Sequence, residues 1–176
     1  GERIAMYNEG LYSDTYVHSR LTQQELMRRR LMLAACVVLP VLALVVLPGV
    51  LKILGLLASV VIDIILIYFL PNPHIDFEYV FVDGQIDFDR IIAENARKNM
   101  CRTDLEKAEV VAPEGSHYLD AFQNLPIQDY SSRNEEDRQY IIVANGEKGN
   151  IKIRFTPDER LLDQMKTKSR SKIKDE

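Results

Sequence analysis

The hydrophobic pattern divides the chain into three segments. Between Leu31 and Leu70, 33 of 40 residues are apolar, and only Lys52 and Asp63 are charged. This block follows 30 mostly polar residues and precedes 106 residues in which apolar and polar positions are mixed. The distribution excludes a single soluble globule, and it excludes a transporter with many spans because the apolar residues form one block.

The apolar block is too long for one transmembrane helix. Forty residues in one α-helix extend about 60 Å, roughly twice the hydrocarbon thickness of a bilayer. Pro48-Gly49 predicts the break, because proline stops a helix and glycine tolerates positive φ. We therefore expect a transmembrane helical hairpin at residues 31–70, with spans at 31–47 and 50–70. Pro40 is expected to kink the first span, which membrane helices tolerate.

The orientation of the hairpin follows from three arginines directly before it. Arg28, Arg29 and Arg30 form a short positive flank, and such flanks stay in the cytoplasm. Two spans return the chain to the side it left. We therefore expect a two-span protein of the cell membrane, with both termini cytoplasmic: an arm at 1–30 and a domain at 71–176.

Two further features concern the arm. Thr22 is followed three residues later by Glu25, a capping-box pattern that predicts a helix start upstream of the membrane. Met6 is a plausible native start, which would leave Gly1–Ala5 as extra sequence.

The apolar block contains a few polar and small residues. Asp63 and Cys36 are equally far in sequence from the predicted turn, so they should lie at similar depth. One interpretation is that Asp63 is functional, either as a proton- or cation-sensitive site or as a polar contact between subunits. The other is that Asp63 is protonated and either hydrogen-bonds the backbone or reaches toward the membrane interface. The second reading is favoured because no partner charge is present. Gly55, Ala58 and Ser59 predict a close helix–helix contact.

After residue 71 the hydrophobic period changes to two. Apolar and acidic residues alternate through Ile75–Phe81 and again through Ile86–Asp89. Asp83-Gly84 between these runs predicts a tight β-hairpin. A second hairpin is predicted from strands at 139–144 and 150–155.

The rest of the domain gives weaker patterns. Residues 99–104 predict a strand, 105–111 a strand or short turn, and 118–122 a helical turn. A helix should begin at about residue 157, where Pro157 precedes two acidic residues. The fold class is therefore α+β: a transmembrane helical hairpin, then a small antiparallel β-rich domain with a C-terminal helix.

This order of elements resembles a known family. The chain looks like the bacterial PH-like domains that are found beside paired membrane helices. The features that carry this likeness are the strand, Asp-Gly turn and second strand, the stretch Arg102-Thr103-Asp104-Leu105-Glu106-Lys107-Ala108-Glu109, the late hairpin and the final helix. The whole chain resembles a family of small bacterial two-span membrane proteins with a C-terminal cytoplasmic domain of unknown function. Phe77–Ser116 and Arg154-Phe155-Thr156-Pro157 look most typical of it. The resemblance implies a PH-like fold and carries over no activity.

Motifs that would indicate an enzyme are missing from the sequence. It has no glycine-rich phosphate loop, nucleophile elbow, zinc-protease helix or dinucleotide fingerprint. Cys36 and Cys101 should be reduced thiols, and His18, His74 and His117 stand alone, so no metal or other cofactor is expected. The acidic groups at 87–89 and 135–137 are explained by solvent-facing positions.

The last candidate feature is a run of basic residues with no acids among them. It comprises Lys166, Lys168, Arg170, Lys172 and Lys174. Such residues can contact the anionic cytoplasmic leaflet of the membrane. Alternatively, they interact favourably with the negative end of the helix dipole and continue into a frayed tail. Nucleic-acid binding is disfavoured, because residues 71–176 hold 16 basic and 21 acidic side chains, a net charge of −5.

Two functional hypotheses remain ahead of an enzyme. The preferred one is a non-enzymatic, membrane-anchored interaction or assembly module, whose edge strands bind a protein partner or a second copy. The alternative is a lipid-headgroup or ion-responsive sensor that uses the basic tail or Asp63. The expected partners are the lipid bilayer and an unidentified protein or the chain itself.

Overall fold

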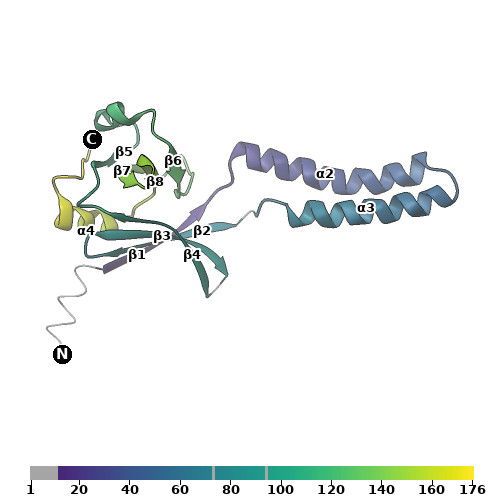
Figure 1. The fold of residues 1–176 in the computed structure, drawn as a ribbon, viewed down its shortest axis with the longest axis horizontal. Helices are drawn as coiled ribbons and strands as arrows, with labels where there is room; N and C mark the ends of the chain where they lie inside the picture. Colours follow the sequence, from purple (N-terminus) through teal and green to yellow (C-terminus); the bar gives the residue numbers. More distant parts are fainter. Residues whose placement is uncertain (1–11, 73, 94) are drawn as a thin grey trace. The chain divides into compact units, whose positions relative to one another are not determined.

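The chain forms two compact units in a computed structural model that describes residues 12–72, 74–93 and 95–176 (Figure 1). One unit is a pair of apolar helices within residues 21–73, and the other is a β-rich domain formed by the remaining described residues. The choice between Gly1 and Met6 as the native start lies outside the described residues.

The helical unit consists of α2 (Gln23–Val46) and α3 (Val50–Tyr68), which pack side by side. Both helices are long and apolar enough to cross a membrane. The predicted capping box is present, since Thr22 and Glu25 each hydrogen-bond the other's backbone N–H. The predicted break is confirmed as well: Gly49 adopts φ 54° and ψ −129°, a conformation that is essentially restricted to glycine.

The first sheet is antiparallel throughout. Its strands, in spatial order, are β1 (Tyr12–Ser19), β2 (Ile75–Val82), β3 (Gln85–Ala93) and β4 (Ala96–Asp104). The predicted Asp83-Gly84 hairpin joins β2 to β3. Both turn residues have positive φ, 46° and 88°, as expected for the turn that matches strand twist.

Strand β1 was not expected, and it changes the predicted domain division. We expected residues 1–30 to be an arm separate from the domain at 71–176. Instead, Tyr12–Ser19 pairs with β2 over its whole length, from Tyr12 opposite Val82 to Ser19 opposite Ile75. The two apolar helices are therefore inserted in the chain between two neighbouring, hydrogen-bonded strands.

The second sheet has one parallel pair. Its order is β5 (Val110–Pro113), β7 (Tyr140–Gly146), β8 (Gly149–Phe155) and β6 (Ile127–Asp129), with β6 parallel to β8. The predicted late hairpin is confirmed with a tighter turn. The expected helical turn is the 3₁₀ helix η1 (His117–Phe122). Residues 105–107 turn before β5 begins.

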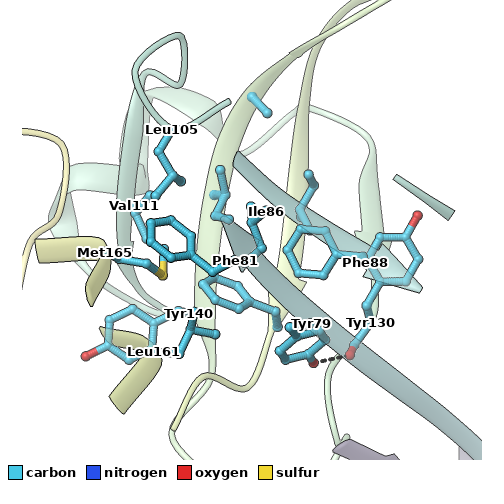
Figure 2. Close-up of a cluster of buried hydrophobic side chains, with 14 of the residues drawn as sticks. Tyr79, Phe81, Ile86, Phe88, Leu105, Val111, Tyr130, Tyr140, Leu161 and Met165 are labelled. Carbon is cyan, nitrogen blue, oxygen red and sulfur yellow. Dashed lines mark hydrogen bonds between the residues drawn. The ribbon is translucent and has the colours of Figure 1, made fainter. Parts of the chain in front are cut away.

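One hydrophobic core joins the two sheets and the last helix, α4 (Glu159–Ser169). Figure 2 shows Phe81, Ile86 and Phe88 of the first sheet with Val111 and Tyr140 of the second. Two apolar residues of α4 close this core: Leu161 and Met165 are fully buried. The α+β class is confirmed, with sheets that are antiparallel except for the β6–β8 pair and with a C-terminal helix.

Candidate functional site

The basic C-terminal segment is an ordered part of the β domain. Val111 donates its N–H to the Lys172 carbonyl at 2.8 Å, and Lys174 donates to the Val111 carbonyl at 2.8 Å. Ile173 between them is only 6% exposed. The segment therefore lies along the outer edge of β5, and the alternative of a frayed tail is wrong for these residues.

Two of the predicted lipid-contacting lysines are paired with acids of the same domain. Lys166 Nζ lies 2.5 Å from an Asp175 carboxylate oxygen, and Lys168 Nζ lies 2.9 Å from Asp83 Oδ1. These hydrogen bonds raise the pKa of both lysines above their ordinary value. The pairs use part of the charge that a membrane surface would otherwise attract.

The other three basic residues differ in exposure. The Lys174 ammonium lies 5.2 Å from the centre of the Tyr118 ring, and Lys172 is half-buried. Arg170 is exposed to solvent. The five residues predicted to contact anionic lipid thus do not form one free cationic surface.

The three arginines of the predicted positive flank lie within α2. Arg29 donates from Nη1 to the Pro71 carbonyl at 2.9 Å, which joins the first turns of α2 to the segment after α3. Arg28 and Arg30 extend from the same turn region. The flank is therefore helical and adjoins the apolar part of α2 directly.

The polar residues inside the helical unit meet as the spacing predicted. The Cys36 side chain lies within hydrogen-bonding reach of the Asp63 carboxyl group. Asp63 Oδ1 is buried and has no hydrogen-bond partner among the described residues. No third side chain that could ligate a metal joins them in the described part of the chain.

The predicted small-residue contact is confirmed at two of three positions. A Cβ atom on Gly55 would lie 2.3 Å from a Leu47 methyl carbon and 3.2 Å from the Ala43 Cβ. Ser59 is 4% exposed, and its hydroxyl donates to the Leu56 carbonyl. Ala58, in contrast, is exposed.

A groove borders the outer edge of β4. Its cavity measures about 520 Å³ and is lined by Met100–Thr103 of β4, by Pro126 and Gln128, by the 145–148 turn and by Ile151. We call it the β4 groove. In the described chain, the residues of β4 have no backbone partners in a strand on this side, since β4 pairs only with β3.

A thiol lies in the β4 groove. Cys101 is half-buried and packs against the domain core beside Ile151. Burial, and then the charge of Asp87, raise the pKa of the Cys101 thiol above its ordinary value. The thiol is therefore protonated at neutral pH, which does not suit it to act as a nucleophile.

The strand that carries the groove is held firmly in its sheet. Arg102 donates two hydrogen bonds to Asp87 of β3, at 2.6 and 2.9 Å. Arg97 forms an ion pair with Glu78 of β2, beyond β3. These contacts keep the β4 edge in place without a further strand beside it.

A second polar region surrounds Arg154, in the segment that the sequence marked as typical of the resembled family. Arg154 contacts Asp129 at 3.3 Å and Glu114 at 2.8 Å. Burial opposes ionisation of Asp129, but hydrogen bonds from Ser131 and the charges of Arg154 and Arg133 outweigh it and hold its pKa below the ordinary value. The charges of this region satisfy one another, which indicates a structural role.

The β4 groove could not be found from sequence. Its walls come from three separate stretches of the chain, 100–103, 126–128 and 145–151, and the residues of β4 show no strict alternation. The only hint in the sequence was the isolated Cys101 within the predicted strand at 99–104, and this residue does not indicate which other segments lie beside it.

Comparison with known protein families assigns the chain to a family. A family model described as a bacterial PH-like domain (DUF6106) matches residues 9–175, which include β1, both apolar helices and the whole β domain. No curated protein and no solved structure matches the chain. The chain belongs to the DUF6106 family of bacterial PH-like domains.

Proposed function

We propose that this protein is a membrane-anchored, non-enzymatic interaction or assembly module. The observation that carries the proposal is the position of the two apolar helices between the paired strands β1 and β2. Since Ser19 pairs with Ile75, the chain enters and leaves the helical pair on one side of the membrane. An even number of crossings is required, and two helices of suitable length supply it.

The charge of the helix flank supports a cytoplasmic position for the β domain. Three basic residues, Arg28, Arg29 and Arg30, precede the apolar part of α2. At the opposite end of the helical pair, near the turn, the only basic residue is Lys52, and the more basic end is the one expected in the cytoplasm. Both the β domain and the chain termini are then on the cytoplasmic side in this proposal.

A binding role fits the domain better than catalysis. The sequence lacks catalytic motifs, and the thiol of Cys101 is held protonated. The β4 edge, in contrast, presents unpaired strand backbone, which proteins use to bind extended segments. The alternative, a lipid or ion sensor, has less support, because Lys166 and Lys168 pair with acids of their own domain.

Membrane topology can be tested with single cysteines. In a Cys36→Ala, Cys101→Ala background, Tyr16→Cys, Ser171→Cys and Lys52→Cys each place one thiol at an exposed position. A membrane-impermeant maleimide should label Lys52→Cys in intact spheroplasts, and the other two only after lysis. Labelling of Tyr16→Cys and Ser171→Cys from opposite sides, or release of the protein by alkaline carbonate, would contradict the membrane anchor.

The interaction role needs a separate measurement. Affinity capture of the full-length protein in mild detergent should recover a specific protein partner or an oligomer of the chain. Recovery of neither, with the β domain shown to be folded, would contradict the module hypothesis.

A further inference from the structure

The β4 edge is an open strand edge that carries an unpaired lysine. Three of its nine residues are basic: Arg97 and Arg102 form ion pairs with Glu78 and Asp87, and Lys98 forms none within the described chain. Lys148 lines the β4 groove from the β7–β8 turn, together with its acidic neighbour Glu147. Lys98 and Lys148 are exposed, and no ion pair is formed by either within the described chain.

The geometry of β4 makes pairing with a second copy unfavourable. In an antiparallel pair of β4 strands, basic residues near one end would face basic residues near the other, and like charges directly opposite destabilise a sheet. Proteins use such charges, especially lysine, to protect open edges from self-association. The β4 edge therefore disfavours a second copy of itself and favours a strand that brings acidic side chains to Lys98.

A bulge interrupts the same strand. Cys101 lies opposite Phe88 and Asn99 opposite Asp89, so Met100 is the extra residue. Bulges redirect side chains near binding sites. Met100 is 39% exposed at the groove, where Pro126 and Ile151 add further apolar surface. The β4 groove thus combines apolar contacts with Lys148 in its lining, and Lys98 lies on the same strand two residues before Met100.

We propose that the β4 groove binds an extended acidic peptide segment of a partner protein, which adds a strand to the free edge of β4. Acidic side chains of the segment lie near Lys98 and Lys148, and apolar side chains between them contact Met100 and Ile151. This inference rests on the proposed interaction role and names the chemistry of the partner.

Peptide probes test the proposal on the full-length protein in detergent micelles. The first probe is a fluorescent heptapeptide of alternating glutamate and valine. The second replaces glutamate by lysine, and the third keeps the glutamates but carries methyl groups on alternate backbone nitrogens. The first probe should bind and should slow alkylation of Cys101 in a Cys36→Ala background, whereas the other two should bind at least about tenfold more weakly.

Matched variants locate the binding. The double variant Lys98→Glu, Lys148→Glu should weaken binding of the first probe about tenfold, because two attractive contacts become repulsive. Arg160→Glu changes an exposed charge on α4, outside the β4 groove, and should leave binding unchanged. Circular dichroism of each variant establishes that it is folded.

Three results would overturn the proposal: equal binding of the lysine probe, equal binding of the methylated probe, or full binding by the double variant. Failure here is distinct from failure of the proposed function. A captured partner that binds the double variant as well as the wild type excludes the β4 groove and leaves the module role intact. Absence of any partner or oligomer contradicts that role itself.

Discussion

Arg97 on β4 forms an ion pair with Glu78 on β2, across the intervening strand β3. The Glu78 side chain is 8% exposed and that of Arg97 is 36% exposed. Hydrogen bonding to Glu78, and then to Tyr16 of β1, raises the pKa of Arg97 above its ordinary value. Arg97 therefore links the edge strand β4 to both strands that flank the helical insertion.

Replacement of Arg97 should destabilise the first sheet. Arg97→Ala leaves the Glu78 carboxylate, which is 8% exposed, without its cation and should lower the free energy of unfolding. The chain has eight tyrosines and no tryptophan, so urea unfolding of the full-length protein can be followed by tyrosine fluorescence. The double variant Glu78→Gln, Arg97→Ala should be more stable than Arg97→Ala alone. Equal stability of the two would show that the buried charge is not the cause.

A second prediction concerns the Tyr79 hydroxyl in the core (Figure 2). Tyr79 is fully buried, donates to the Tyr130 carbonyl and accepts from the Thr156 N–H at 3.2 Å. Tyr79→Phe leaves both backbone groups unsatisfied and should cost about 2 kcal/mol in urea unfolding. Tyr12→Phe, at a 44% exposed position, is the control and should change stability by less than about 0.5 kcal/mol. A similar loss in both variants would refute a specific role for this hydroxyl.

The helices and hairpins were predictable because their signals are local. The apolar block, Pro48-Gly49 and Asp83-Gly84 each act on their own segment. Strand β1 was missed because its pattern is inverted. Ser13, Thr15 and Ser19 are buried, whereas Tyr12 and Tyr16 are exposed. These small polar residues pack against α4 and the 131–132 segment. Which face of β1 is buried is therefore decided by contacts with distant parts of the chain and not by the hydrophobicity of β1 itself.

The candidate sites depended on distant segments and were harder to predict. Asp63 and Cys36 could be placed together because a hairpin fixes which residues share a depth. The partners of Lys166 and Lys168, in contrast, are Asp175 and Asp83, and nothing local marks either pair. A run of lysines in sequence therefore overstated the free positive charge at the end of the chain.

The helical pair should depend on Gly55. A larger residue at this position would collide with Ala43 of α2 and with Leu47 directly after it, so Gly55→Ile should separate the helices and lower the melting temperature in detergent. Ala58→Ile adds a similar side chain at an exposed position of α3 and is the matched control. The melting temperatures of both variants can be measured from the loss of the helical circular dichroism signal on heating. If the two variants melt alike, close packing at Gly55 does not stabilise the pair.

The stability of the β domain should depend on pH through Asp129. Its folded pKa lies below the model-peptide value of 3.8, so ionised Asp129 stabilises the domain fully above that value and loses this effect as the pH falls through the folded pKa. Asp129→Asn should cost about 2 kcal/mol at pH 7, and the difference from the wild type should shrink below about pH 4. Urea unfolding between pH 3 and 7 measures this. A difference that stays constant with pH would exclude the charge as the cause.

The C-terminal segment should stabilise the domain through Ile173. This residue is 6% exposed, belongs to the main core, and forms a parallel bridge with Val111 of β5. Ile173→Ala removes buried apolar contacts and should cost about 2–3 kcal/mol of unfolding free energy. Ser171→Ala, two residues away at an exposed position, should change it little. If Ile173→Ala unfolds at the wild-type urea concentration, the segment covers β5 without stabilising it. If it is destabilised as expected, the C-terminal segment closes the β5 edge of the second sheet to a partner strand.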